Sequence, residues 1–281
     1  MKKIIVFFGV ASSLLFWGCA YAHQPNIVTQ SPVLVSDPEI SKAFYDTLQG
    51  SPRMYVIESK EDFEFYAGLL VPKEDTAEKF SAHISRIDEE TRVASLDGDA
   101  DEWEVIYEPF GADWYFKGPE FGTRVPAGTY AISVFNEKNE GKYVLAIGGE
   151  EKFGFMETIR ATWLLPKLKI DFFGKSAISI FISPIGIVGS IVFLAIMFGI
   201  WKIIFVLAAR YVGRDEAGKF EKNTGKKDRI VRLILGGTLF IGGTAFWNIP
   251  VLIFGTFVLY EAFTGWCGLY ALIGKNTCAA E

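Results

Sequence analysis

The chain has 281 residues, of which 50% are hydrophobic and 22% charged, with a formal net charge of −5. It is too apolar for a disordered or nucleic-acid-binding chain and too charged for a membrane protein throughout. Residues 23–150 hold 24 acidic against 11 basic residues, whereas residues 151–281 hold 9 against 15. This asymmetry predicts an acidic soluble domain joined to a basic membrane region.

Residues 1–22 have the features of a secretory signal peptide. Two lysines precede an apolar stretch, and Ala20-Tyr21-Ala22 ends it with the small-x-small pattern of a cleavage site. Cleavage there would make His23 the first residue of the mature chain. Two alternatives stay open. Cys19 could be lipidated instead, or the segment could remain as an uncleaved anchor, for which its apolar run is short.

Residues 23–150 show an apolar pattern with a period near two, interrupted by turn residues. Strands are expected at residues 54–58, 63–70, 81–87, 91–96, 104–107, 128–135 and 142–147. Short strands separated by turns predict an antiparallel β-sandwich or jelly roll. The closing run 126–148 resembles the last hairpin of bacterial extracellular β-sandwich modules. The opening residues are similar to those of uncharacterised membrane-anchored bacterial proteins.

An acidic loop follows the fourth of these strands. Asp97, Asp99 and Asp101 alternate along it, and Glu108 comes further on, so carboxylate oxygens suited to Ca²⁺ are gathered here. However, Glu102 occupies the position where an EF-hand loop requires glycine for its turn. A solvated hairpin turn is therefore the competing expectation, and calcium is not favoured.

The two histidines of the chain, His23 and His83, both lie in this domain. A free N-terminal amine and its imidazole can chelate Cu(II), as in the histidine-brace copper proteins that this arrangement resembles. The sequence thus predicts a possible copper site at His23, with His83 as a further ligand. The alternative is that His23 merely follows the signal peptide and His83 is a surface strand residue.

The membrane half begins with residues 151–175, where apolar and charged side chains alternate as in an amphipathic helix that ends near Pro166. We expect it to lie on the membrane surface or to pack on the sandwich. Residues 185–208 are apolar over the length of a transmembrane helix, with Lys202 near the interface. The basic loop 209–229 is expected to be cytoplasmic by the positive-inside rule.

Two further spans are expected at residues 230–247 and 251–269, joined by a tight turn. Several glycines along them allow close approach of the two backbones. The fold class that follows is a mainly β exported domain followed by an α-helical membrane region with three transmembrane helices. The C-terminus would then be cytoplasmic.

Two motifs in this region are characteristic of a family. Residues 223–232 read Asn-Thr-Gly-Lys-Lys-Asp-Arg-Ile-Val-Arg, and residues 264–278 begin with Thr-Gly-Trp-Cys-Gly-Leu-Tyr. Together with the glycine-rich spans they resemble the YgaP-like two-helix inner-membrane domain, over residues 220–279. The chain differs by having Gly268 where proline commonly follows the cysteine, and it carries no rhodanese domain. Sulfur transfer therefore cannot be inherited from that fusion partner.

Four residues of the membrane half are candidate site residues. Cys267 and Cys278 could form a redox pair or bind a soft metal, although their spacing is not that of a CxxC motif, and reduced structural thiols are the alternative. Glu261 lies well inside the third span, where an unpaired carboxylate is costly. In a helical hairpin its counterpart lies near Arg232, so a pair between them is expected. A proton or ion site, or a contact with another subunit, stays open.

These observations predict a non-enzymatic bacterial inner-membrane protein that displays an extracytoplasmic β-sandwich for binding a ligand or partner. Residues 23–175 would be periplasmic, and the hairpin would anchor the chain in the lipid bilayer or assemble with a membrane-protein partner or a second copy. The alternative function is metal or redox handling, with copper at His23 and thiols at Cys267 and Cys278. No nucleic-acid partner is expected, and transport is disfavoured for three spans.

Overall fold

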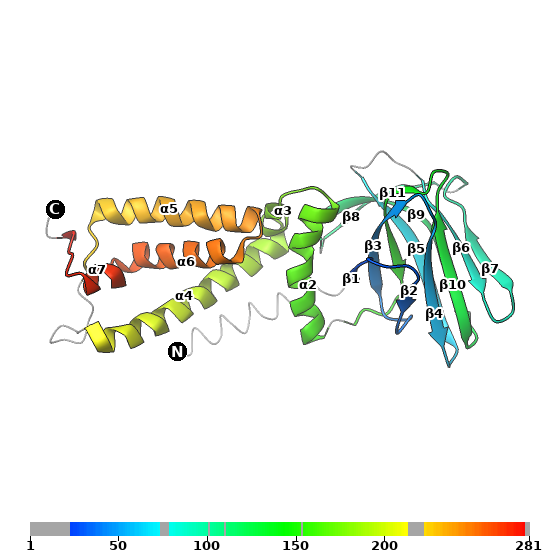
Figure 1. The fold of residues 1–281 in the computed structure, drawn as a ribbon, viewed down its shortest axis with the longest axis horizontal. Helices are drawn as coiled ribbons and strands as arrows, with labels where there is room; N and C mark the ends of the chain where they lie inside the picture. The colour runs from blue at the N-terminus through cyan, green and yellow to red at the C-terminus, as the bar shows by residue number, and fades with distance from the viewer. Residues whose placement is uncertain are drawn as a thin grey trace. The chain divides into compact units, whose positions relative to one another are not determined.

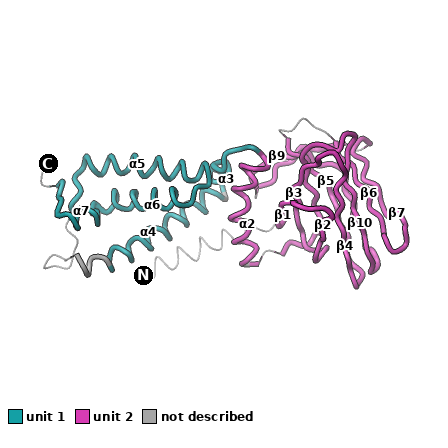
Figure 2. The backbone as a smooth tube through the Cα atoms, in the orientation of Figure 1, with its two compact units in different colours: residues 1–15, 174–281 teal, residues 16–173 magenta. Residues whose placement is uncertain are grey.

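The computed structural model describes residues 23–73, 79–100, 102–109, 111–152, 154–212 and 222–278 (Figure 1). The chain divides into two compact units between Phe173 and Gly174 (Figure 2). The predictions for the signal peptide, for Asp101 and for most of the basic loop lie outside the described residues.

The unit that ends at Phe173, unit 2 in Figure 2, contains two β-sheets (Figure 1). The six-stranded sheet has the spatial order β1 (Gln24–Ile27), β3 (Lys42–Gln49), β11 (Glu140–Ile147), β5 (Phe63–Pro72), β9 (Asp113–Val125) and β8 (Glu104–Glu108). The five-stranded sheet has the order β2 (Val33–Val35), β4 (Arg53–Ser59), β10 (Gly128–Phe135), β6 (Ser81–Arg86) and β7 (Thr91–Leu96). The pairs β1–β3 and β2–β4 are parallel, and the other strand pairs are antiparallel. The expected mainly β domain is confirmed.

The hydrophobic core of this unit comes from alternate residues of both sheets. On β10, Tyr130, Ile132 and Val134 are buried and the residues between them are not. On β6, Ala82 and Ile84 are buried in the same way. Because side chains alternate across a strand, one face of each sheet supplies the core and the other faces outward. Burial of this apolar surface holds the described part of the domain together.

The long strand β9 was not predicted, nor were β1, β2 and β3. Gly118, Pro119 and Gly122 interrupt the sequence of β9 and are typical of loops rather than strands. In the structure, the pairing of β5 with β9 shifts register between Gly68 and Leu70, opposite the position of Pro119. A proline is tolerated there because the irregularity removes the need for its missing N–H.

Helix α2 (Phe155–Lys167) and the π-helix η1 (Leu168–Phe172) follow the last strand and belong to the same unit. Ala161, Leu165 and Leu168 are buried. The α-helix ends at Lys167, near Pro166 as expected. The chain continues into η1, where the Phe173 N–H donates to the Leu168 carbonyl at 3.0 Å.

An ion pair and an aromatic cluster fix η1 to the six-stranded sheet. Lys169 Nζ lies 2.5 Å from Asp113 Oδ2, and both side chains are at most 2% exposed. Lys169 also donates to the Ala112 carbonyl at 2.9 Å. The ring of Phe172 packs edge-on against Tyr45 at 5.4 Å. Because a buried charge is stable only when paired, these contacts hold the segment after α2 in one place on the sheet.

The unit that begins at Gly174, unit 1 in Figure 2, is helical among its described residues. It contains α3 (Ile178–Phe181), α4 (Pro184–Val212), α5 (Lys226–Ala245), α6 (Ile249–Thr264) and α7 (Gly268–Leu272). Within the described ranges, one helical stretch is long and apolar enough to cross a membrane, residues 186–207 of α4, with a mean hydropathy of 2.5. Helix α6 is apolar but has 16 residues, and α5 begins with charged residues. Three spans therefore remain a prediction.

Helices α5 and α6 pack closely as an antiparallel hairpin (Figure 1). A Cβ atom on Gly243 would lie 2.6 Å from the backbone N of Leu252, and one on Gly255 would lie 2.7 Å from the backbone N of Phe240. Only glycine permits this approach. Between the helices, the Asn248 side chain accepts the backbone N–H of Val251 at 3.2 Å and caps α6.

Helix α4 packs against α6 through polar and aromatic contacts. The indole N–H of Trp201 donates to Thr256 Oγ1 at 3.1 Å, and Thr256 is fully buried. The rings of Phe205 and Trp266 meet edge-on at 4.9 Å. These contacts join the apolar helix and the hairpin into one unit.

Candidate functional site

The acidic loop is built as a turn. Asp97 Oδ1 accepts the backbone N–H of Asp99 at 3.0 Å, and Glu108 Oε2 accepts the backbone N–H of Gly111 at 2.5 Å. Both carboxylates thus bond backbone amides of their own turns. Over the described ranges, no group of three or more His, Cys, Asp or Glu side chains is arranged to hold a metal ion.

The two histidines are placed on different sheets. His23 precedes β1 of the six-stranded sheet and its Nδ1 bonds Ser41 Oγ, while burial lowers the pKa of this imidazole. His83 lies on β6 of the five-stranded sheet, between the inward-facing Ala82 and Ile84, and therefore points outward. There it bonds Ser95 Oγ at 3.0 Å. The structure does not bring His23 and His83 together.

Arg232 and Glu261 are in direct contact across the hairpin. Glu261, on α6, is 2% exposed and accepts a hydrogen bond from the Arg232 guanidinium of α5. The guanidinium also donates to Asp228 Oδ1 at 3.3 Å and lies over the ring of Tyr270 at 5.0 Å. A carboxylate that would be costly if left alone in an apolar helix is thus neutralised by a neighbouring cation.

Cys267 belongs to the same group of side chains. It is 2% exposed, and its thiol lies near enough to the Glu261 carboxylate and the Arg232 guanidinium to interact electrostatically with both. We call Arg232, Glu261 and Cys267 the thiol cluster. It brings together a thiol, a carboxylate and a cation.

A backbone network encloses the thiol cluster. The Asn223 amide donates to the Cys267 carbonyl at 2.9 Å, and its oxygen accepts the Cys267 N–H at 2.7 Å. The N–H groups of Asn223 and Thr224 both donate to the Gly265 carbonyl. The Thr277 N–H in turn donates to the Asn223 carbonyl at 3.0 Å. Three segments that are distant in sequence are therefore joined around the buried cysteine.

The structure places the second cysteine differently. Cys278 is half-exposed, its backbone N–H donates to Asn276 Oδ1 at 2.9 Å, and neither thiol is in a disulfide. The structure joins Cys267 to Glu261 and Arg232, two residues that the sequence analysis treated as a separate pair. Sequence reasoning missed Asn223 altogether, although it stands first in the motif that carries the family resemblance.

An apolar helix followed by a close-packed, glycine-dependent hairpin with a neutralised internal charge is typical of an integral membrane protein. Residues 220–281 match the family described as "Inner membrane protein YgaP-like, transmembrane domain". The resemblance is confirmed over these residues, which follow a mainly β domain and an apolar helix in the same chain. No curated protein matches the chain.

Three solved structures are similar to parts of the chain. The pre-peptidase C-terminal domain of a Bacillus anthracis collagenase is 9% identical, with a TM-score of 0.27, covering 45% of this chain and 95% of that one. CorA, a surface-associated copper-binding protein of Methylomicrobium album BG8, is 6% identical, with a TM-score of 0.23 and coverage of 46% and 100%. A β-glucosidase of Paenibacillus barengoltzii is 11% identical, with a TM-score of 0.21 and coverage of 44% and 13%. Scores this low support no functional inference.

Proposed function

We propose that this inner-membrane protein displays its β-sandwich outside the cytoplasm, where the sandwich binds a ligand or protein partner. The helical hairpin anchors the chain in the bilayer or assembles with other subunits. The charge asymmetry supports this orientation, because the basic residues lie in the loop between the apolar helix and the hairpin. The protein acts by binding and not by catalysis.

A hollow on the sandwich is the observation that carries the binding proposal. It has a volume of about 390 Å³ and is lined by six carboxylates and two lysines, together with Pro38, Ile40, Ser59 and Phe63. The charged residues are Asp37, Glu39, Glu58, Glu61, Asp62, Glu150, Lys60 and Lys152. We call this hollow the acidic groove. One of the lysines, Lys152, is already paired with Glu150 at 2.6 Å.

The chemistry of the acidic groove favours a cationic ligand or a basic protein surface. Carboxylates held together in a concave surface produce a negative potential that draws cations toward it. Complementary charge across an interface raises the association rate and selects among partners. A partner with clustered lysine or arginine side chains therefore fits the acidic groove best.

Charge reversal in the acidic groove tests the binding proposal. The full chain with Glu58→Lys and Glu61→Lys is compared with the native chain by cross-linking in native membranes, purification and mass spectrometry. An exposed acidic residue of the β10–β11 turn, Glu137→Lys, serves as a control for added positive charge. The partner recovered with the native chain should be lost in the groove variant and retained in the control. Equal recovery from all three chains would refute the role of the groove.

The proposed orientation has a separate test. A reporter enzyme that is active only outside the cytoplasm is fused after Glu150 and, in a second chain, after Lys222. We expect activity from the first fusion and none from the second. Activity only from the second fusion would reverse the topology and exclude display of the sandwich outside the cytoplasm.

The alternative function is metal or redox handling. Its second half would rest on Cys267, which is 2% exposed and lies in the thiol cluster with Glu261 and Arg232. To test for copper, the metal is titrated into the purified mature chain, which begins at His23, and into the same chain with one residue added before His23. Copper binding that the added residue abolishes would support a site at the amino terminus, and equal binding by both chains would exclude it.

A further inference from the structure

Helix α2 has two apolar faces, of which the sandwich uses one. Ala161 and Leu165 are buried, whereas Met156 is 68% exposed, Ile159 39% and Trp163 53%. The exposed residues follow one another at spacings of three and four and therefore share one side of the helix, opposite the buried pair. We call Met156, Ile159 and Trp163 the α2 stripe. Isolated exposed apolar residues are ordinary, but three large ones in a row on a helix mark an interaction surface.

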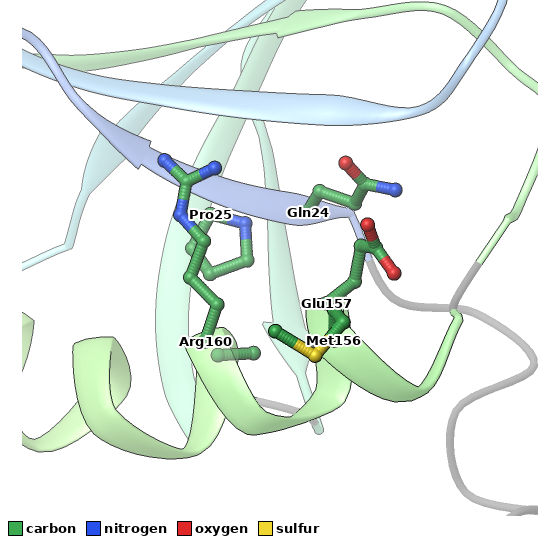
Figure 3. Close-up of a pocket in the computed structure, with 6 residues that line it drawn as sticks. Gln24, Pro25, Met156, Glu157 and Arg160 are labelled. Atoms are coloured by element: carbon green, nitrogen blue, oxygen red, sulfur yellow. The ribbon is translucent and has the colours of Figure 1, made fainter.

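The surroundings of the α2 stripe are hollow and basic. A cavity of about 190 Å³ lies where α2 faces β1, lined by Met156 and Arg160 together with Gln24, Pro25, Glu157 and Ala161. Figure 3 shows Arg160 extending from the helix beside Pro25. Arg160 and Lys167 are both exposed and flank the stripe, one turn of helix to either side of Trp163.

The charge of this segment is opposite to that of the sandwich before it. Residues 151–175 hold five basic and three acidic residues, whereas residues 23–150 are strongly acidic. A basic helix with an apolar face that includes tryptophan has the composition of helices that lie in the membrane interface. Basic residues near a membrane surface are attracted to anionic lipid headgroups.

The position of α2 in the chain indicates what binds to the α2 stripe. The apolar stretch of α4 begins at Gly186, and about 20 residues of chain, which reach at most ~70 Å, separate it from Lys167. Part of that connection is helical and therefore shorter. A bilayer that holds α4 is thus always within reach of the α2 stripe, whereas another protein would have to find it by diffusion.

We propose that the α2 stripe binds the surface of the bilayer, with its apolar side chains at the boundary between headgroups and acyl chains. Lys167 then contacts anionic headgroups, while Arg160 stays bonded to Asn26 of β1. The sandwich binds to the bilayer through one defined face of its last helix. This inference does not depend on the acidic groove or on any ligand of the sandwich.

Quenching by brominated lipids tests the proposal. The full chain is placed in nanodiscs whose lipids carry bromine either near the headgroup or near the bilayer centre, and tryptophan emission is measured. Trp163→Phe should remove a component of the tryptophan emission. In the native chain, bromine near the headgroup should quench this component more than bromine near the bilayer centre does. Trp103→Phe is the matched control, because Trp103 is partly buried against the sandwich core and donates to the Gly98 carbonyl. Its removal should leave bromine quenching unchanged.

Two further measurements distinguish the bilayer from other occupants. The quenching of Trp163 should rise when anionic lipid replaces zwitterionic lipid, and Lys167→Gln should reduce that rise. If Trp163→Phe changes quenching no more than Trp103→Phe does, the proposal is wrong. The proposal is also wrong if the emission of Trp163 is the same in all lipids and changes only between nanodiscs with one chain and nanodiscs with two. The α2 stripe then binds a second copy of the chain.

Discussion

The close contact between α5 and α6 allows a sharp test with two adjacent glycines. Gly243 faces α6, and an added Cβ would lie 2.6 Å from the backbone N of Leu252 and 2.7 Å from its Cα. Gly242 precedes it on the same helix, and a Cβ there would have no atom within 4 Å. Gly243→Ala and Gly242→Ala thus make the same chemical change in the same turn, and only the first creates a clash.

The magnitude follows from this geometry. Ordinary contact needs about 3.5 Å, so the helices must separate by roughly 0.9 Å, since backbone atoms cannot rotate away. A gap of this size removes up to half of each contact energy, or about 1.5 kcal/mol over some 20 atom pairs. Alanine also regains about 0.8–1 kcal/mol of helix propensity at both positions. Overpacking of this kind costs about 1–3 kcal/mol in measured proteins. We expect Gly243→Ala to destabilise the hairpin by about 0.5–2 kcal/mol and Gly242→Ala to stabilise it by up to about 1 kcal/mol.

Labelling of Cys267 provides the assay. Its thiol is 2% exposed while the hairpin is folded, whereas Cys278 is half-exposed and reacts at once. The full chain in mixed micelles is titrated with a denaturing detergent, and the slow phase of thiol labelling reports unfolding of the hairpin. Gly243→Ala should shift the midpoint to lower detergent and Gly242→Ala should not. Identical midpoints for the two variants would refute the inference that the Gly243 contact limits the approach of the helices.

Three further outcomes follow from the structure. Lys169→Met removes the cation paired with the buried carboxylate of Asp113 and should destabilise the β unit by about 3–5 kcal/mol in urea unfolding. Changing Asp113 to asparagine as well should recover part of the loss. The Lys117 ammonium holds the pKa of Glu120 below 4.5. The stability that this carboxylate contributes is therefore present above pH 4.5 and is lost as the pH falls through the pKa of the folded state. NMR titration of Glu120 should give a pKa below 4.5, and Lys117→Gln should raise it. Asn223→Ala removes both hydrogen bonds to the Cys267 backbone and should speed labelling of that thiol in native membranes, whereas an unchanged rate would show that the network does not protect it.

Strand β10 shows how alternation makes a strand predictable. It has the expected limits because buried and less buried residues alternate along it and turns bound it. β3 was missed because its first five residues are all buried, so that no alternation is visible. Its Lys42 and Asp46 are charged, and only tertiary partners satisfy them: Lys42 donates to the Ser36 carbonyl, and Asp46 accepts from Arg53 at 2.6 Å. Such pairings cannot be read from the local sequence.

The sequence also predicted one part of the candidate site and missed another. Helical periodicity placed Arg232 opposite Glu261, because a hairpin with a short turn fixes which residues face each other. The addition of Cys267 depends on the chain reversing at Gly265, which has a φ of 72°. The path beyond a left-handed cap is set by tertiary contacts, here those of Asn223. Sequence reasoning therefore grouped the two cysteines by type, whereas the structure groups one of them with its charged neighbours.

The position of the last strand affects how the sandwich bears mechanical load. Strand β11 is the last strand before the membrane region and is joined to it through α2 and η1, yet it lies in the interior of its sheet, bonded on one side to β3 and on the other to β5. Tension that detaches η1 and α2 is therefore passed to a strand whose removal requires two ladders to rupture. A terminal strand at the sheet edge would instead peel away one bond at a time. The connection to the membrane is thus made where the sheet best resists extraction.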